Sequence, residues 1–458
     1  MLRRDQVTTR WTHSARSKFR GQRRSSRGLG WVRAIVLLQR IADLRPGEGA
    51  KVLAAGAWFC ALMTANGALR PLRDSMAVAG GVNDLHWLFT ATFLVMLAAV
   101  PIYGLAVARC GRARLVPVVH RFFALNLLGF FVVMHGLVGG ESDAVATWTA
   151  RVFFVWTSVF NLFVISLFWS VLADLFSGQD ARRLFGLIGV GGSIGAIAGP
   201  AIGGAVALWV SPSWLPLIAA LLLELSLVAM RRMGREPSEA PASPVPDDPV
   251  PDDPIGGRAF AAIPELLRSP LLLGICAYVL LLTMSSTVLY FMQAQIVAVS
   301  FTDEGTRTAV FAGVDLSVNA LTLAIQALLT GRLIQRIGLS WSLATLPLLC
   351  ALGFACLAIA PVLLVLLGLQ ILRRVASYAV SRPAREVLYT MVDRSQRYKA
   401  KSLIDTVVYR GGDALTGWAF TGIKALGLGL GGIALVMAPV AGLWAGVGAL
   451  LGRDQKST

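Results

Sequence analysis

Twelve apolar stretches, each about as long as a helix that crosses a bilayer, follow one another through most of this chain. A membrane-spanning helix needs about 20 apolar residues, and the stretches lie near residues 52–74, 86–108, 115–138, 149–173, 184–209, 213–231, 271–298, 308–331, 340–360, 362–383, 402–423 and 426–451. Of the 458 residues, 56% are hydrophobic and only 15% are charged, against roughly 45–50% and about 25% in soluble proteins. The sequence therefore predicts an all-α integral membrane protein and excludes a large catalytic domain outside the membrane.

A proline-rich segment divides the predicted spans into two sets of six. Residues 237–254 contain seven prolines, which favours an extended linker over a helix. We predict a basic tail over residues 1–33, a first half over 34–231, a linker over 232–258 and a second half over 259–452. Short amphipathic stretches at residues 31–44 and 260–267 precede the two halves, and the first is predicted to lie on the membrane surface.

The basic charge is concentrated at the start of the chain. Of the net charge of +17, residues 1–33 carry +9, from ten basic residues against Asp5. We interpret this tail as a disordered cytoplasmic extension that contacts anionic lipid head groups, or as the product of a misassigned start codon; it lacks the apolar region of a signal peptide. Because no folded module or interleaved aromatic residues accompany the charge, nucleic acid is not expected as a partner.

One short motif recurs in the two halves. Residues 104–111 read GLAVARCG and residues 331–338 read GRLIQRIG, so the pattern G-x4-R-x-G is expected to end the second helix of each half. It consists of Gly104, Arg109 and Gly111 in the first half and of Gly331, Arg336 and Gly338 in the second. Two parallel six-helix repeats with a long central loop are the layout of the major facilitator fold. The motif resembles the conformational loop between helices 2 and 3 of that superfamily, without its usual aspartate.

The distribution of positive charge predicts the orientation. Six basic and two acidic residues lie between Arg382 and Lys401, whereas the loop over residues 136–149 contains Glu141 and Asp143 and no lysine or arginine. Since basic loops stay in the cytoplasm, both termini are expected to be cytoplasmic. The predicted location is the plasma membrane, which is the inner membrane of a bacterium.

Charged and polar residues within the spans are the candidates for substrate binding, because a charge inside a bilayer usually faces a water-filled cavity or a partner. The candidates are Arg70 and Arg73 in the first span, Asn161 and Asp174 in the polar stripe of the fourth, Arg374 in the tenth, and Asp405, Arg410 and Asp413 in the eleventh. Arginine forks suit carboxylate and phosphate.

Each of these groups also has a structural interpretation. Arg73 can pair locally with Asp74 at a helix end, and Arg410 with Asp413 as an ion pair that joins helices. Glu224 and Asp315 look isolated in the sequence and are candidates for proton coupling only.

Glycines predict close helix packing in the fifth span. Gly195, Gly199 and Gly203 lie four residues apart, which gives a flat strip for another helix and favours helix packing over a phosphate cradle. No G-x4-G-K-[ST] pattern occurs, so an ATP-hydrolysing pump is not supported. The five cysteines and four histidines show no disulfide or zinc-ligand spacing, and no metal or cofactor is expected.

Four segments together resemble a known family. They are DLRPGEG before the first span, LRPLRDSMAVAGG at its end, FFVWTSVFNLFVISLFWSVLADLF followed by RRLFG, and YKAKSLIDTVVYRGGD. They are similar to bacterial major facilitator proteins akin to the nucleotide (ATP/ADP, NTP/NDP) exchange transporters, over about residues 42–452. The resemblance implies that Arg70, Arg73, Asp174, Asp405, Arg410 and Asp413 bind the nucleotide. Arg73 stands where the exchangers typically have lysine, and Asp174 where they often have asparagine.

We therefore expect a secondary active transporter, monomeric in the lipid bilayer, that moves a small anionic metabolite by alternating access, with nucleotide antiport as the specific version. Proton-coupled transport of another solute is the alternative within the same class. A membrane-embedded enzyme or lipid scramblase is the alternative from another class. An enzyme needs a clustered constellation, but His86, His120 and His135 fall in different spans.

Overall fold

The computed structural model describes residues 48–110, 112–136, 142–176, 178–233, 263–328, 330–392, 400–401 and 403–453. The predicted tail, the surface stretch at residues 31–44, the proline-rich linker and Gly111 lie outside these residues. The domain boundaries drawn from the sequence therefore stay predictions.

The first six predicted spans form helices. These are α3 (Glu48–Ala79), α4 (Leu85–Cys110), α5 (Arg112–Met134), α6 (Asp143–Leu175), α7 (Gly178–Trp209) and α8 (Leu215–Arg231), with the short turns η1 (Val82–Asp84) and η2 (Pro212–Trp214). The α3 helix has 32 residues, about 48 Å at 1.5 Å per residue. It therefore extends beyond the predicted 52–74, and Arg70 and Arg73 lie within a continuous helix.

The second set of spans is also helical, but two of them are interrupted. After the short α9 (Ile263–Arg268) come α10 (Pro270–Ser300), α11 (Glu304–Leu328) and α12 (Thr330–Ile359). The tenth span consists of α13 (Leu363–Ala376), the π-helical turn η4 (Ser377–Ser381) and α14 (Arg382–Tyr389). The eleventh contains the π-helical turn η5 (Ile404–Val408) and α16 (Tyr409–Ala425), and α17 (Leu430–Arg453) is the twelfth.

The described residues form helices and no strands. Eleven of the described helical segments are long and apolar enough to cross a membrane. The predicted eleventh span, which carries Asp405, Arg410 and Asp413, is not among those eleven. The prediction of an all-α membrane protein is confirmed.

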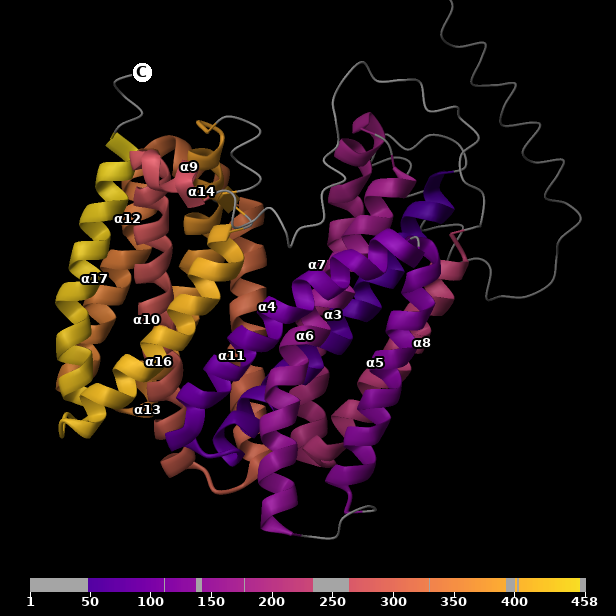
Figure 1. Cartoon of the computed structure of the whole chain (residues 1–458), viewed down its shortest axis with the longest axis horizontal. Coiled ribbons are helices and arrows are strands. Elements are labelled where there is room, and N and C mark those ends of the chain that lie inside the picture. Colours follow the sequence, from indigo (N-terminus) through magenta and orange to yellow (C-terminus); the bar gives the residue numbers. More distant parts are fainter. Residues whose placement is uncertain are drawn as a thin grey trace, which may run out of the picture.

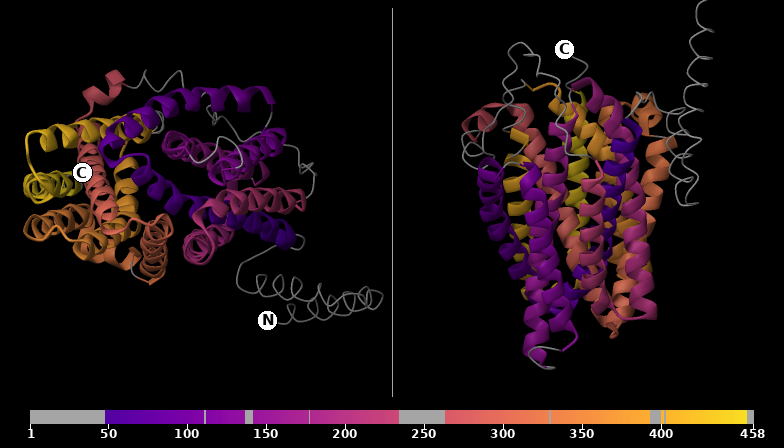
Figure 2. Two further views of the ribbon diagram at one scale, coloured as in Figure 1. Left: turned by 90° about the horizontal axis from the view of Figure 1, so that it is seen from below. Right: turned by 90° about the vertical axis from the view of Figure 1, so that its right-hand side faces the viewer.

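The helices pack into two groups (Figures 1 and 2). One apolar core lies within the first group, and the other lies in the second group and extends to first-half residues such as Phe154. Trp58 and Phe168 belong to the core of the first group, and Tyr278, Phe354 and Trp444 to the core of the second. The groups meet where α7 contacts α11, where α4 contacts α16, and where α3 contacts α10 and α11. This is the arrangement of two six-helix halves predicted from the sequence.

Side chains of both halves close one end of this interface. The ring of Phe89 lies 5.1 Å from that of Phe291 in α10. The indole N–H of Trp418 donates to the hydroxyl of Thr90 at 3.1 Å, and the Trp418 ring lies 4.4 Å from that of His86. His86, Phe89 and Thr90 belong to the first two turns of α4, and α4 begins at the end of the molecule away from the C-terminus (Figure 1).

The repeated glycine and arginine motif ends a helical segment in each half. Gly104 and Arg109 lie in the last turns of α4. In the second half Gly331 and Arg336 lie in the first part of α12, which ends at Gly338, where a φ of 76° separates it from the rest of the helix. Glycine adopts this positive φ without steric cost. Only residue 329, which lies outside the described residues, stands between this first part of α12 and the end of α11 at Leu328.

The glycines of the fifth span face α3. A Cβ atom built on Gly199 would lie 2.6 Å from the carbonyl oxygen of Thr64 and 2.7 Å from the Cα of Gly67. A Cβ on Gly195 would meet the backbone of the same helix, and one on Gly203 would lie 3.2 Å from the carbonyl oxygen of Ala68. Since real Cβ atoms do not approach backbone this closely, the absence of side chains allows α3 and α7 to pack together.

Gly199→Ala is accordingly expected to destabilise the folded protein, by about 1–3 kcal/mol as in other overpacked cores. The matched control is Gly189→Ala in the same helix, where no atom lies within 4 Å of an added Cβ. The measurement is the thermal unfolding of both variants in detergent. Equal unfolding temperatures would contradict the packing role of Gly199.

Candidate functional site

A cavity of about 880 Å³ lies between the two halves. Its walls come from α3, α4 and α6 of the first half and from α10, α11 and the tenth and eleventh spans of the second. It extends to Glu386 and Lys401, whose side chains are partly exposed. The cavity is therefore open at the end opposite the closed contact of Phe89 with Phe291.

The first half contributes one face of α3. Asn66, Arg70, Arg73 and Asp74 line the cavity, at intervals of three to four residues that place them on one side of a helix. The Arg73 guanidinium lies 3.8 Å from Asp74 and 4.1 Å from the centre of the Phe154 ring. Asp74 also accepts a hydrogen bond of 3.0 Å from the hydroxyl of Tyr290 in the second half.

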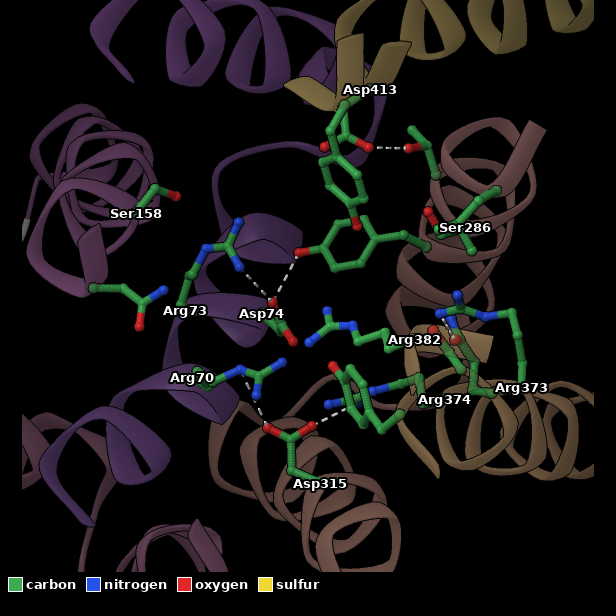
Figure 3. Close-up of a pocket in the computed structure, with 18 of the residues that line it drawn as sticks. Arg70, Arg73, Asp74, Ser158, Ser286, Asp315, Arg373, Arg374, Arg382 and Asp413 are labelled. Carbon is green, nitrogen blue, oxygen red and sulfur yellow. Dashed lines mark hydrogen bonds and ion pairs between the residues drawn. The ribbon is translucent and has the colours of Figure 1, made fainter. Parts of the chain in front are cut away.

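Asp315 of α11 lies between arginines from both halves. Its Oδ1 atom is 2.5 Å from Nη1 of Arg374, and its Oδ2 atom is 3.8 Å from Nε of Arg70. The Asp315 side chain is only 3% exposed. The sequence suggested an isolated carboxyl; the structure corrects this, because the two arginines come from helices far from residue 315 in the chain (Figure 3).

The two π-helical turns lie in the helices that carry most of the charge. In a regular α-helix, a step of four residues exceeds one full turn by about 40°. Side chains four residues apart therefore move gradually off a single face. Yet Arg374, Tyr378 and Arg382 all line the cavity across η4, as do Asp405 and Tyr409 across η5. The wider π turn offsets the drift, and such turns are frequent at functional sites.

The eleventh span brings a hydrogen-bonded carboxylate to the cavity. Asp413 is buried and accepts a hydrogen bond of 2.6 Å from Thr287 in α10. Arg410 lies 3.7 Å from the other oxygen of Asp413. Nearer the open end, Arg385 lies 3.8 Å from Asp405, and Lys401 lies 2.7 Å from Glu386.

Arg373 is a buried cation without a carboxylate partner among the described residues. It is 9% exposed, and its Nη2 atom donates to Gln370 at 3.0 Å, while Gln370 donates to Gln293 at 2.7 Å. Its Nε atom has no hydrogen-bond partner within the described part of the chain. Arg382 likewise forms no ion pair with a described carboxylate and lies 4.5 Å from the centre of the Tyr378 ring.

Cations outnumber carboxylates in the cavity. Its lining contains eight cationic side chains against five carboxylates, a formal excess of three positive charges: Arg70, Arg73, Arg373, Arg374, Arg382, Arg385, Lys401 and Arg410 against Asp74, Asp315, Glu386, Asp405 and Asp413. The guanidinium groups of Arg70, Arg73, Arg374 and Arg382 extend toward a shared space (Figure 3). Because cations this deeply placed are costly without a partner, the excess favours an anionic ligand.

The structure brings together most of the residues that the sequence singled out. Seven of the eight predicted substrate-binding residues line the cavity: Arg70, Arg73, Asn161, Arg374, Asp405, Arg410 and Asp413. The eighth, Asp174, does not line it and is exposed near the end of α6. Sequence reasoning missed Arg373, because only its neighbour Arg374 shares the face of Tyr378 and Arg382. Glu224 lies away from the cavity, 3.9 Å from Arg121, with both side chains about half exposed.

A second cavity, of about 840 Å³, has a different character. It is bounded by α4, α5 and α6 and lined mainly by apolar side chains. Its charged groups are Arg151 and Asp84, which form an ion pair. This cavity offers no excess of charge for a polar solute.

Comparisons with known proteins agree with this architecture. Residues 52–314 match the sequence model of the Major Facilitator Superfamily. No curated protein matches the chain in sequence. The chain is similar in fold to the nucleoside transporter NupG, with 14% identity and a TM-score of 0.56 over 89% of this chain and 99% of that one.

Two further solved structures show the same likeness. One is a POT family transporter in complex with 5-aminolevulinic acid, with 11% identity and a TM-score of 0.61 over 87% of this chain and 96% of that one. The other is a bacterial homologue of the iron transporter ferroportin in the inward-facing state, with 15% identity and a TM-score of 0.60 over 88% and 98%. These likenesses concern the fold alone. The family match spans more than half of the chain, so the chain belongs to the major facilitator superfamily.

Proposed function

We propose that this protein is a secondary active transporter that carries an anionic, phosphorylated metabolite across the membrane by alternating access. The observation that carries the proposal is the excess of arginine over carboxylate in the cavity between the halves. A phosphate group accepts charge-assisted hydrogen bonds from arginine forks. Arg70 and Arg73 come from the first half and Arg373, Arg374 and Arg382 from the second, so one bound anion can contact both halves.

Nucleotide exchange is the specific version of this proposal. The resemblance of the α3 and eleventh-span segments to nucleotide exchangers supports it. The aromatic rings of Phe89 and Phe311 also line the cavity, together with the arginines. Proton-coupled transport of a different solute remains the alternative. The carboxylates Asp74, Asp315 and Asp413, all inside the cavity, support that alternative.

Counter-flow in proteoliposomes tests the proposal. Vesicles that contain the purified protein are loaded with unlabelled ADP or glucose 6-phosphate and receive the labelled compound outside. We expect internal substrate to stimulate uptake of at least one of these phosphorylated compounds, and unlabelled adenosine to compete poorly because it carries no phosphate. No stimulated uptake of either compound, or equal competition by adenosine, would refute the proposal.

We further propose that the open end of the cavity faces the cytoplasm and that both termini are cytoplasmic. Arg382, Arg385 and Lys401 surround the open end, and basic groups are retained on the cytoplasmic side. On this assignment the structure is the inward-open state of the transport cycle.

Cysteine labelling in intact cells tests this orientation. In a variant without the native cysteines, Ser142→Cys is expected to react with an impermeant thiol reagent from outside, and Asp247→Cys only after the cells are opened. Ser142 is exposed at the beginning of α6, and residue 247 belongs to the predicted linker. The opposite labelling pattern would reverse the orientation.

A further inference from the structure

The carboxylate of Asp315 already occupies the position of an anion between the two halves. It contacts Arg374 within the second half at 2.5 Å and Arg70 of the first half at 3.8 Å. Arg374 is also largely buried, and its Nη2 atom has no hydrogen-bond partner among the described residues. These arginines share one carboxylate, so each keeps unused capacity to bind an anion.

The helix that carries Asp315 is attached to the first half close to this ion pair. One turn beyond Asp315, the side-chain amide of Asn319 donates a hydrogen bond of 2.6 Å to the backbone carbonyl of Ala196 in α7. Asp315 therefore lies beside the contact between the halves, where it can reach Arg70. The ion pair between Arg70 and Asp315 crosses this contact. A change in the charges of the cavity is therefore expected to affect how the two halves are positioned relative to each other.

When no substrate is bound, the carboxylate of Asp315 is the negative charge between Arg70 and Arg374. Guanidinium groups that approach one another away from water repel strongly, because the attraction or repulsion of charges grows as the effective dielectric constant falls. Closure of the cavity around Arg70 and Arg374 therefore needs a negative charge between them. A phosphate of the substrate can supply it, and so can Asp315.

We propose that Asp315 is a built-in counter-anion that bridges Arg70 and Arg374 and reduces their mutual repulsion when no substrate is bound. It allows the transporter to reorient without bound substrate, so the protein can perform net transport and not only one-for-one exchange. A bound substrate phosphate takes over at least one of the two arginines from Asp315. This role rests on the proposed transport of a phosphorylated anion. It assigns to Asp315 the ability of the protein to perform net transport in addition to exchange.

The test compares two fluxes from the same proteoliposomes, loaded with labelled ADP, or with labelled glucose 6-phosphate if that compound is exchanged faster. Efflux into substrate-free buffer measures net transport, and efflux into buffer with unlabelled substrate measures exchange. For Asp315→Asn we expect the ratio of net efflux to exchange to fall about tenfold or more, because the empty cavity then holds uncompensated guanidinium groups. Because the ratio is taken on one preparation, differences in protein yield cancel.

Three further variants separate this role from a merely structural one. Asp315→Glu keeps the negative charge and is expected to keep most of the wild-type ratio. Asp315→Asn combined with Arg374→Gln removes one charge of each sign, so its ratio is expected to return toward the wild-type value even though affinity falls. Glu224→Gln removes a carboxylate of α8 that lies outside the cavity, and it should leave both fluxes unchanged.

The outcomes are distinguishable. A wild-type protein that exchanges its substrate but releases none into substrate-free buffer would overturn the counter-anion role alone, and so would an Asp315→Asn variant with an unchanged ratio. A wild-type protein that exchanges neither phosphorylated compound would overturn the proposed function and the counter-anion role with it. A selective loss of net efflux in Asp315→Asn, with recovery in the double variant, is the result expected here.

Discussion

Arg373→Gln is expected to lower the transport efficiency for a phosphorylated substrate by about tenfold to a hundredfold or more while leaving the folded protein at least as stable as the wild type. A hydrogen bond to a charged group contributes about 1.5–3 kcal/mol, and 1.4 kcal/mol corresponds to a factor of ten. Arg373 is buried and has no described carboxylate partner. Its charge is therefore a cost to folding, which the hydrogen bond to the neutral side chain of Gln370 offsets in part and which a bound anion would offset further.

Initial uptake rates in proteoliposomes and thermal unfolding in detergent check the two parts of this prediction. Arg121→Gln is the matched control, because Arg121 lies half exposed outside the cavity beside Glu224; it should leave the uptake unchanged. If Arg373→Gln lost stability and activity together, Arg373 would be a structural residue supported by Gln370. If it lost neither, the excess charge of the cavity would not serve transport.

The second large effect is expected at Arg410 and Asp413. Arg410→Ala should weaken the apparent affinity about tenfold to a hundredfold, because it removes an arginine fork, and it should also destabilise the protein. The loss of Arg410 leaves Asp413 buried, with Thr287 as its hydrogen-bond partner among the described residues. Breaking a fully buried ion pair costs about 3–5 kcal/mol, which is an upper bound here because the Arg410 side chain is 29% exposed. The measurements are the KM for uptake and the unfolding temperature.

The double variant Arg410→Ala with Asp413→Ala distinguishes the two roles of this pair. We expect it to recover stability, since no unpaired carboxylate is left, but not substrate affinity. Recovery of transport as well would mean that Arg410 serves only to neutralise Asp413. Arg73, which lies over the ring of Phe154 and not against a second-half carboxylate, would then be tested by its own substitutions.

The fold was predictable from the sequence because its main determinant is local. A run of about 20 apolar residues predicts a membrane-spanning helix, whatever the rest of the chain contains. The eleventh predicted span is helical in the structure, but it is not among the eleven described segments that are long and apolar enough to cross a membrane, because it carries Asp405, Arg410 and Asp413. The break at Gly338 was predicted as well, because the G-x4-R-x-G motif was expected to end a helix there.

The site was only partly predictable, for reasons that differ from residue to residue. Arg70 and Arg374 were recognised because a charge inside an apolar span is conspicuous by itself. The role of Asp315 depends on two helices far away in the sequence, so only the packed structure gives it partners. Arg373 was passed over because helical periodicity selects Arg374, and the π turn η4 that orients this span has no sequence signature in the chain.

The central claim is that the cavity binds anions through its excess of guanidinium groups, and the affinities of adenosine, AMP and ADP for the purified protein test it most directly. These compounds share one base and sugar and differ in phosphate charge, so isothermal titration in one buffer isolates the contribution of charge. The account predicts that Kd falls from adenosine to AMP to ADP, and that the three values converge as salt is added, because exposed parts of the cavity are screened. Equal binding of all three compounds, or tightest binding of adenosine, would contradict it.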